Sequence, residues 1–517
     1  MPESKLKLAL IPLDERPVNT RYPQMLGAIG GAEVLLPPFA IRGRQRAPSD
    51  VNAVAAWLRE TAPQCAAALV SCDGLAFGNL INARISQDSA ADALARLRLL
   101  AEINDGCPVH AFSLITRVSN ADDAVEEPSY WAHWGMAFYR FARLTHGVEQ
   151  GALNAEEQRE RSELQERLPP ELVADWLTRR LRNHTVNLGL LDMAARGQLT
   201  SLLLTSDDTS ALGFPSRERD WLRGWPRLIG PALADRVQMH PGADEVGSAL
   251  VAKLLNERQN RTPRVWPRFA IPDDGELIAP YEDRPIRETV HGQIRACGCV
   301  MAETPEDSDI ILGVATPSPR RTDYRPEFLA EDRATRTNVY RDFLAELGRW
   351  QDRGTPVALA DVAYPNGSDP LLTELLLSDD YPLRPGELCA YGAWNTAGNT
   401  LGTVVAQASC SLRVRDNGER AAAQRLFLTH RLLEDFGYQT VIRRQARAEA
   451  ERRWGRREPD PDDDAQQAEL CTFIEARLTE TLAHLQERGV GSGLQIAPNS
   501  VRLPWRRTFE VDFDLKS

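Results

Sequence analysis

Two adjacent carboxylates, Asp207 and Asp208, are the residues of this 517-residue chain best suited by type and spacing to do chemistry. They directly follow the apolar run 202–206, which is expected to form a buried strand. Two like charges held close together raise one pKa, so that one carboxyl group stays protonated while the other is ionised. A general acid and a charge-stabilising partner need this arrangement. In the alternative interpretation, one of the two residues caps the turn or helix that follows.

A second segment, residues 391–400, has the composition of a site for a neutral polyhydroxylated ligand. Tyr391 and Trp394 offer aromatic faces to a sugar ring or a base, and Asn395 and Asn399 offer hydrogen-bond donors and acceptors to hydroxyl groups. In the alternative interpretation the segment is a buried turn, with Trp394 in the core.

Polar side chains follow several other predicted strands. The first run, 6–13, leads into a loop that contains Asp14, Glu15 and Arg16. In the alternative interpretation, an Asp14–Arg16 or Glu15–Arg16 ion pair only shapes this loop and does not bind a ligand. Ligands of parallel α/β proteins bind outside the carboxyl ends of the strands. We therefore expect the substrate-binding residues to be Asp14, Arg16, Asn19, Asp73, Gly74, Arg117, Asp361, Asn366, Asp369, Tyr391, Trp394, Asn395 and Asn399.

The elements that must position these residues are short apolar runs, each followed by an amphipathic segment, which predict a mainly parallel α/β sheet. Eight or so such runs fit a (β/α)8-barrel-like core over 1–410, with a helical insertion at 119–198. Ser49 is expected to cap the first long helix. Residues 411–517 are expected to be mainly helical and to end in a strand, where Phe509, Val511 and Phe513 alternate. Two tandem doubly wound α/β domains are the alternative.

Composition excludes several classes of function. With 73 acidic and 61 basic residues the net charge is -12, so neither nucleic acid nor a membrane surface is an expected partner. The eight cysteines and eight histidines lack metal-ligand spacing, and we expect no metal and no cofactor. No Gly-rich phosphate loop or serine nucleophile elbow occurs. Without a signal peptide or membrane span we expect a cytoplasmic protein, in which the helical region 411–490 could supply a homo-oligomer interface.

Four motifs together resemble the bacterial family known as domain of unknown function 4127, over essentially the full length. They are Pro-Leu-Asp-Glu-Arg-Pro-Val-Asn at 12–19, Thr-Ser-Asp-Asp at 205–208, Asp-Val-Ala-Tyr-Pro-Asn-Gly at 361–367 and Gly-Ala-Trp-Asn-Thr-Ala-Gly-Asn-Thr at 392–400. The family name implies no activity.

A second resemblance concerns residue types alone. Asp207-Asp208 after a strand, with the amide-rich Trp394-Asn395 segment downstream, is similar to the active sites of β-N-acetylhexosaminidases of the O-GlcNAcase type. These retaining enzymes use the substrate's own 2-acetamido group as nucleophile. The resemblance implies that Asp207 polarises the acetamido group and that Asp208 is the general acid/base.

We therefore expect a glycoside hydrolase that releases an N-acetylhexosamine, GalNAc or GlcNAc, from a small glycoside. Two alternatives stay open. One is a hydrolase in which Asp14, Asp207, Asp208 and Asp361 gather around Mg²⁺ or Mn²⁺. The other is a non-catalytic sugar-binding protein.

Overall fold

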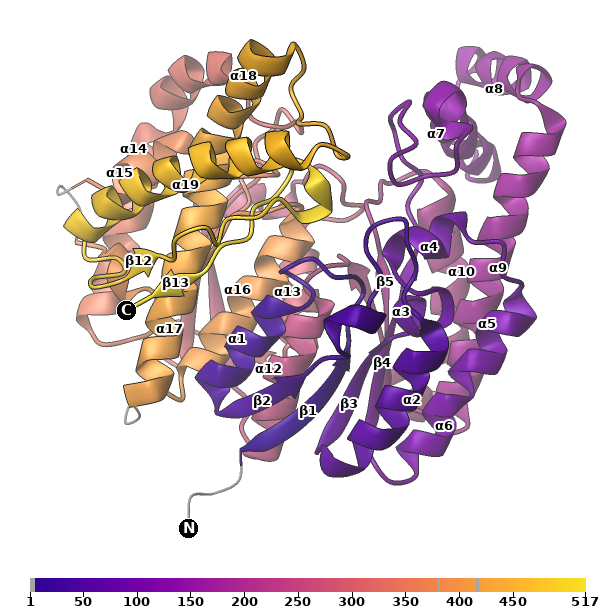
Figure 1. Ribbon diagram of the computed structural model, residues 1–517, viewed down its shortest axis with the longest axis horizontal. Coiled ribbons are helices and arrows are strands. Elements are labelled where there is room, and N and C mark those ends of the chain that lie inside the picture. The colour runs from indigo at the N-terminus through magenta and orange to yellow at the C-terminus, as the bar shows by residue number, and fades with distance from the viewer. Residues whose placement is uncertain (1–4, 379–381, 415–417) are drawn as a thin grey trace. The chain divides into compact units, whose positions relative to one another are not determined.

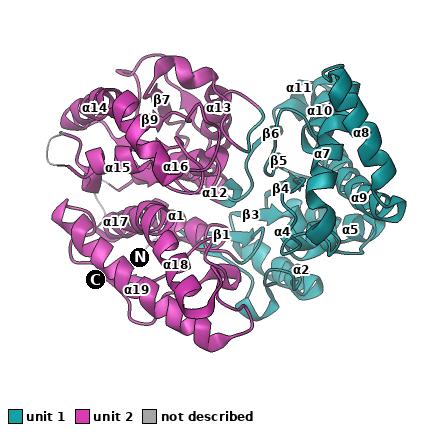
Figure 2. Cartoon of the chain, turned by 90° about the horizontal axis from the view of Figure 1, so that it is seen from above, with its two compact units in different colours: residues 1–15, 32–247, 281–283 teal, residues 16–31, 248–280, 284–517 magenta. Residues whose placement is uncertain are grey.

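The computed structural model describes residues 5–378, 382–414 and 418–517. The chain forms two compact units, and each unit is assembled from separate stretches of sequence (Figure 2). Unit 1 comprises residues 1–15, 32–247 and 281–283, and unit 2 comprises residues 16–31, 248–280 and 284–517. Each unit is mixed α/β and contains one parallel sheet (Figure 1).

Unit 1 contains a six-stranded parallel sheet in the order β2-β1-β3-β4-β5-β6. Its strands are β1 (Leu6–Ile11), β2 (Ala32–Leu35), β3 (Ala67–Ser71), β4 (Val109–Ile115), β5 (Ser201–Ser206) and β6 (Val237–Pro241). Its helices are α2 (Val51–Thr61), α3 (Cys72–Phe77), α4 (Leu80–Ile85), α5 (Ala90–Leu97), α6 (Leu99–Asn104), α7 (Trp131–Glu149), α8 (Ala155–Arg167), α9 (Pro170–Ala195), α10 (Phe214–Ile229) and α11 (Pro231–Ala234).

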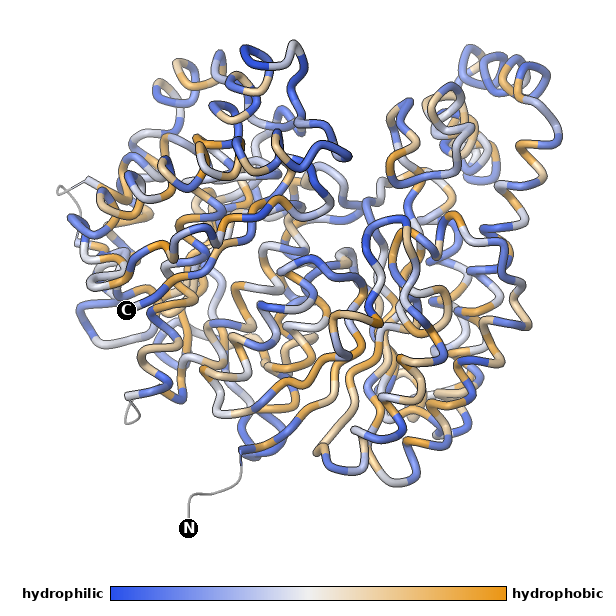
Figure 3. The backbone as a smooth tube through the Cα atoms, viewed as in Figure 1, coloured by the Kyte–Doolittle hydropathy of each residue, from blue (hydrophilic) through white to orange (hydrophobic). Residues whose placement is uncertain are grey.

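The strands of unit 1 are apolar because helices cover the sheet. Every residue of β3, β4 and β5 is buried, as in other parallel sheets that carry helices on both faces. The hydropathy colouring shows these strands as apolar and α8 as mostly hydrophilic (Figure 3). Helices α7, α9 and α10 share a separate aromatic cluster, in which Trp131 stacks on Phe138 and Trp176 stacks on Phe214.

Unit 2 contains a five-stranded parallel sheet in the order β11-β10-β9-β7-β8. Its strands are β7 (Arg264–Phe269), β8 (Val300–Met301), β9 (Ile310–Ala315), β10 (Val357–Asp361) and β11 (Ala390–Gly392), with an antiparallel pair β12 (Gln495–Ile496) and β13 (Leu515–Lys516). Its helices are α1 (Arg21–Gly30), α12 (Val246–Arg258, starting in unit 1), α13 (Ile286–Ala296), α14 (Leu329–Asp352), α15 (Pro370–Leu376), α16 (Ala397–Ser411), α17 (Gly418–Arg431), α18 (Arg443–Trp454) and α19 (Asp464–Glu487). A π-helical segment, Leu432–Ile442, joins α17 to α18.

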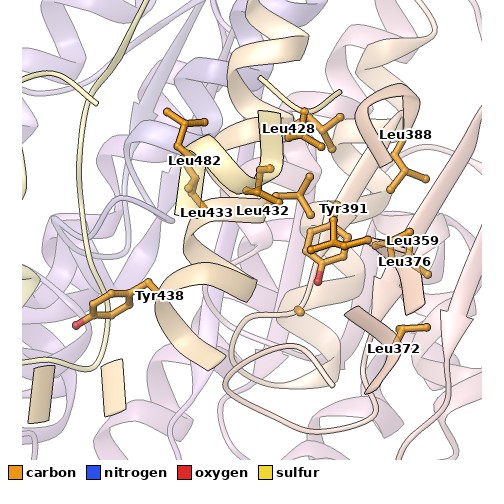
Figure 4. Packing of buried hydrophobic residues seen from close by; sticks show 14 of the residues in the cluster. Leu359, Leu372, Leu376, Leu388, Tyr391, Leu428, Leu432, Leu433, Tyr438 and Leu482 are labelled. Carbon is orange, nitrogen blue, oxygen red and sulfur yellow. The ribbon is translucent and has the colours of Figure 1, made fainter. Parts of the chain in front are cut away.

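The main core of unit 2 lies between the sheet and the C-terminal helices. Leucines of β10, α15 and α17 pack there with Leu482 of α19 (Figure 4). Helix α19 contributes Leu470, Ile474, Leu478 and Leu482, which lie on one face because they are spaced by four residues. This face explains why a helix with many exposed charges still packs stably.

The expectation of a (β/α)8-barrel-like core is not confirmed, because neither sheet closes. In the described residues the first sheet ends at β2 and β6 and the second at β8 and β11. A barrel would need these edge strands to pair with each other. The two sheets instead share one strand order, since β8-β7-β9-β10-β11 repeats the pattern of β2-β1-β3-β4-β5.

In each sheet the strand order reverses once, between β1 and β3 in unit 1 and between β7 and β9 in unit 2. The crevice outside the carboxyl ends of two such strands is the usual ligand site of doubly wound folds.

None of the described helices is both long and apolar enough to cross a lipid bilayer.

Candidate functional site

The carboxyl end of β5 carries Asp207 and Asp208, each bound to a different arginine. Arg84 Nη2 donates to Asp207 Oδ2 at 2.5 Å, and Arg117 Nη1 donates to Asp208 Oδ2 at 2.7 Å. Within the described residues, neither Oδ1 atom makes a hydrogen bond. The Asp207 side chain is 9% exposed and the Asp208 side chain is 29% exposed, so Asp208 is the more accessible of the two.

Two glutamates complete this group, which we call the acid–arginine cluster: Arg84, Arg117, Glu126, Glu127, Asp207 and Asp208. Glu126 bridges the two arginines, with Arg84 Nη1 at 3.1 Å and Arg117 Nη2 at 2.9 Å. The loop with both glutamates is held by Arg46, whose Nη1 donates to the carbonyl oxygens of Ala124 and Glu127. The cluster therefore joins α4, the loop after β4 and the end of β5.

Electrostatics in the cluster leave a proton available. Four acids face two arginines, so full ionisation would leave two uncompensated negative charges in a mostly buried place. Burial and then the neighbouring Asp207 raise the pKa of Asp208, and burial also raises the pKa of Glu127. Burial lowers the pKa of Arg117, but Glu126 and Asp208 more than offset this and hold it well above its usual value. Asp208 is thus suited to act as a proton donor.

The capping interpretation of Asp207-Asp208 is wrong. The next helix, α10, begins at Phe214 and has Gly213 as its N-cap. Asp208 adopts a left-handed backbone conformation, with φ 34°, which is unusual for a residue other than glycine. Strained residues of this kind occur preferentially at active sites.

Three other expected substrate residues of unit 1 lie at the ends of β1 and β3. The Asp73 carboxylate accepts the backbone N–H of Leu114 at 2.9 Å. Burial, reinforced by the charge of Asp207, raises the pKa of Asp73 to about 6. Asp14 and Gly74 line the same small pocket. The fold therefore places Asp14, Asp73, Gly74, Arg117 and the acid pair in unit 1, with Asp73 close enough to Asp207 for its pKa to respond to that charge.

Arg16 and Asn19 belong to unit 2, although they follow Asp14 by only a few residues. The guanidinium group of Arg16 lies 4.5 Å from the ring centre of Trp505 and 3.8 Å from a carboxylate oxygen of Glu510. Asn19 is buried and closes a turn through its backbone N–H, which donates to the Arg16 carbonyl.

Asp361 and Asp369 form a buried network at the end of β10. Asp361 accepts the backbone N–H of Asp369 at 2.6 Å, and burial with the charge of Asp369 raises its pKa to about 8. Asp369 caps α15 by accepting from Leu371, and it also accepts the hydroxyl of Tyr340 at 2.7 Å. These hydrogen bonds fix the start of α15.

The amide-rich loop meets the loop after β10. The backbone N–H of Asn366 donates to the carbonyl of Asn395 at 3.0 Å, and both residues are left-handed, with φ 60° and 64°. Trp394 is 2% exposed and its Nε1 has no hydrogen-bond partner in the described part of the chain. Tyr391 is in the core of unit 2 with its hydroxyl 2.5 Å from Ser368 Oγ, and Asn399 donates to Thr396 Oγ1.

The residues that sequence reasoning missed are Arg84, which binds Asp207, and Glu126 and Glu127, which bind Arg84 and Arg117. They lie 80 or more residues before Asp207, in segments without a motif. The described residues contain no group of three or more His, Cys, Asp or Glu side chains that could hold a metal ion. Arginines occupy the position beside Asp207 and Asp208 that a cation would take, which disfavours the metal-dependent alternative.

Comparison with known proteins identifies the family and nothing more specific. No curated protein and no solved structure matches the chain. A family model described as "Protein of unknown function (DUF4127)" matches residues 8–514. Because this match covers nearly the whole chain, including the acid–arginine cluster, the chain belongs to the DUF4127 family.

Proposed function

We propose that this protein is a glycoside hydrolase that releases an N-acetylhexosamine from a small glycoside by a retaining, substrate-assisted mechanism. The observation that supports the proposal is the inequality of the two adjacent acids at the end of β5. Asp207 is the more buried and is held by Arg84, whereas Asp208 is more accessible and has a raised pKa. Pairs of carboxyl groups whose environments differ in this way divide the roles of acid and stabiliser.

In the first step Asp208 gives its proton to the glycosidic oxygen while the bond between that oxygen and C1 breaks. The carbonyl oxygen of the 2-acetamido group forms a bond to C1 and takes the place of an enzyme nucleophile. Asp207 accepts a hydrogen bond from the acetamido N–H through its second oxygen and stabilises the positive charge that develops. In the second step Asp208 removes a proton from water while the water oxygen bonds to C1, and the bond between C1 and the acetamido oxygen breaks, which restores the 2-acetamido group.

The arginines act as positioning residues in this scheme. Each carboxylate uses Oδ2 for its arginine, which leaves Oδ1 for the substrate. Arg117 is bound to Glu126 at 2.9 Å as well as to Asp208, so Glu126 helps to fix the guanidinium group that holds Asp208. Preorganisation of this kind reduces the reorganisation that the reaction would otherwise require.

The test compares Asp208→Asn with wild type on N-acetylhexosaminides that have a poor alkyl or a good nitrophenyl leaving group. Loss of a general acid costs about 10²- to 10⁴-fold in rate, and we expect this loss for the alkyl glycoside and a smaller one for the nitrophenyl glycoside. The matched control is Asp105→Asn, an exposed aspartate of unit 1. Equal losses on both substrates, or full activity of Asp208→Asn, would contradict the assignment.

A chelator in the same assay separates the two hydrolase hypotheses. We expect turnover to survive it, because arginines are the cationic partners of the acid pair. Turnover that depends on added Mg²⁺ or Mn²⁺ would favour a metal-dependent hydrolase. Saturable sugar binding without turnover of any glycoside would leave a sugar-binding protein.

A further inference from the structure

Helix α10 of unit 1 has apolar residues on two sides. Its inward side packs within the unit, where Phe214 and Leu222 are buried. Its outward side carries Trp221, Trp225 and Leu228, which are between 49% and 80% exposed although they recur at the i, i+4, i+7 spacing of a packed helix face. A surface helix normally turns charged side chains to water, so the outward side of α10 has the character of an interface.

Helix α9 extends this apolar surface, because it runs beside α10 in the same direction (Figure 1). The Trp176 ring of α9 lies 5.3 Å from the Phe214 ring at the start of α10, and two turns later the His184 ring lies 5.8 Å from the Trp221 ring. Two exposed leucines precede His184 by one and two turns, and they therefore lie on its side of α9. We call the exposed apolar surface of the two helices the α9–α10 patch: Leu177, Leu181, Trp221, Trp225, Leu228 and Ile229.

The α9–α10 patch has the size and composition of one half of a stable interface. Taking about 200 Å² for each fully exposed side chain, it exposes roughly 700 Å², against about 300–600 Å² for the largest apolar patch of a typical monomer. A standard interface buries about 800 Å² on each partner. Interface centres are enriched in tryptophan and arginine, and here the Arg217 guanidinium group stacks on Trp221, 4.4 Å from the ring centre. The patch and a narrow rim would therefore bury enough surface for a stable complex.

The order of residues along α10 favours a second copy of the same helix as the partner. Positions 221, 224, 225 and 228 stand symmetrically about the midpoint between 224 and 225. In an antiparallel pair of α10 helices, Trp221 of one copy therefore meets Leu228 of the other, and each Trp225 meets the other Gly224. Apart from α10 itself, no described atom lies within 4 Å of a Cβ placed on Gly224, so this position leaves room for the tryptophan.

Charged side chains at the two ends of α10 favour the same arrangement. Asp220 and Arg227 are exposed and seven residues apart, so they lie on one edge of the helix. Asp220 binds Arg219 of its own chain at 2.8 Å, but its side chain is still 49% exposed. The twofold axis of an antiparallel pair brings Asp220 of each copy to Arg227 of the other. An anionic lipid surface fits less well, because the chain carries a net charge of -12.

We propose that the α9–α10 patch is the interface of a homodimer, in which α10 packs antiparallel against α10 of a second copy about a twofold axis near Gly224. The proposal places the contact in unit 1 and not in the helical region 411–490. It is independent of the proposed function, since the acid–arginine cluster has no part in it.

The test is sedimentation equilibrium of the full-length protein at about 1–50 µM. We expect the mass to approach twice 57.6 kDa as the concentration rises. Trp225→Gln should weaken dimerisation at least about 30-fold, because a tryptophan at the centre of an interface dominates its binding energy. The matched control is Phe39→Gln, since Phe39 is also an aromatic residue of unit 1 about half exposed but lies outside the patch. Its dissociation constant should stay within about twofold of wild type.

A charge reversal tests the antiparallel packing while leaving the apolar residues in place. Asp220→Arg and Arg227→Asp should each weaken dimerisation about fivefold, because like charges then face each other at two equivalent places. The double variant Asp220→Arg/Arg227→Asp should recover the wild-type dissociation constant, since opposite charges face each other again.

Three results would overturn the proposal: a monomer at about 50 µM, equal effects of Trp225→Gln and Phe39→Gln, or a double variant that dimerises no better than the two single variants. Vesicles that contain phosphatidylserine provide the remaining comparison. If monomeric protein bound these vesicles and Trp225→Gln abolished the binding, the patch would serve a lipid surface and not a second copy.

Discussion

Replacing Arg84 by methionine should destabilise unit 1 strongly. Arg84 has a side chain only 3% exposed and pairs with Asp207, Glu126 and Glu127 at 2.5, 3.1 and 3.4 Å. Methionine fills similar space but leaves three acids near each other without their shared cation. Removing one partner of a buried ion pair costs about 3–5 kcal/mol, because the remaining charge stays buried. That is a large part of the total stability of about 5–15 kcal/mol typical of a folded domain.

Two measurements are needed: urea unfolding gives the free energy of unfolding, and hydrogen exchange of peptides that cover β5 gives the local stability of that strand. We expect exchange in β5 to accelerate in Arg84→Met. It should slow again in the double variant Arg84→Met/Asp207→Asn, because one of the buried carboxylates that lost the arginine is then replaced by a neutral amide. The matched control is Arg196→Met, since Arg196 pairs with Asp192 at 2.8 Å but both side chains are more than half exposed. Exposed pairs contribute little. If Arg84→Met behaved like Arg196→Met, the buried acid–arginine cluster would not stabilise unit 1.

Two further predictions concern the buried carboxylate Asp361 and the packing around two helix or strand glycines. Because the pKa of Asp361 is raised to about 8 in the folded state, its stabilising contribution is present below about pH 4 and lost as the pH rises through 8. Wild type should therefore lose thermal stability relative to Asp361→Asn as the pH rises from about 4 to about 8, and a constant difference between the two would contradict this. Gly392→Ala should cost about 1–3 kcal/mol in urea unfolding, because a Cβ would lie 2.7 Å from Val404 Cγ2 and 2.9 Å from Arg431 Nη2. Gly224→Ala in α10, where no atom lies within 4 Å, should instead gain about 0.5–1 kcal/mol, and equal effects at the two glycines would count against the packing argument.

Local patterns in the sequence predicted strands and their ends well. The run before Asp207 is β5, and the polar residues expected at strand ends do follow β1, β3, β4, β10 and β11. These predictions work because burial on both faces leaves an uninterrupted apolar run. Small shifts remain: Asp50, not Ser49, caps α2 by accepting from the N–H groups of Asn52 and Ala53. Either residue type can do this, so composition alone could not choose.

Pairing between distant segments was not predictable in the same way. Val511 and Phe513 alternate and are buried, as expected, but their segment makes only a single bridge, between Arg502 and Asp512. The alternation of apolar residues indicated which side chains are buried, but a strand also needs a partner strand of matching length. Likewise, nothing near Arg84 in the sequence indicates that it binds Asp207, 123 residues later. The shared strand order of the two sheets left no repeat in the sequence, because many apolar residues can fill the same buried position.

The division of unit 2 into separate stretches has a consequence for how the chain is made. Helix α1 belongs to unit 2, and its Tyr22 packs edge-on against Phe427 of α17, with ring centres 5.1 Å apart. On a ribosome adding about 5–20 residues per second, roughly 20–80 s pass before that partner is synthesised. Throughout this interval α1, whose buried residues include Leu26 and Ile29, lacks its contacts with α17. The nascent chain therefore presents an early hydrophobic segment that a chaperone could shield, and truncation before α17 should leave an aggregation-prone product.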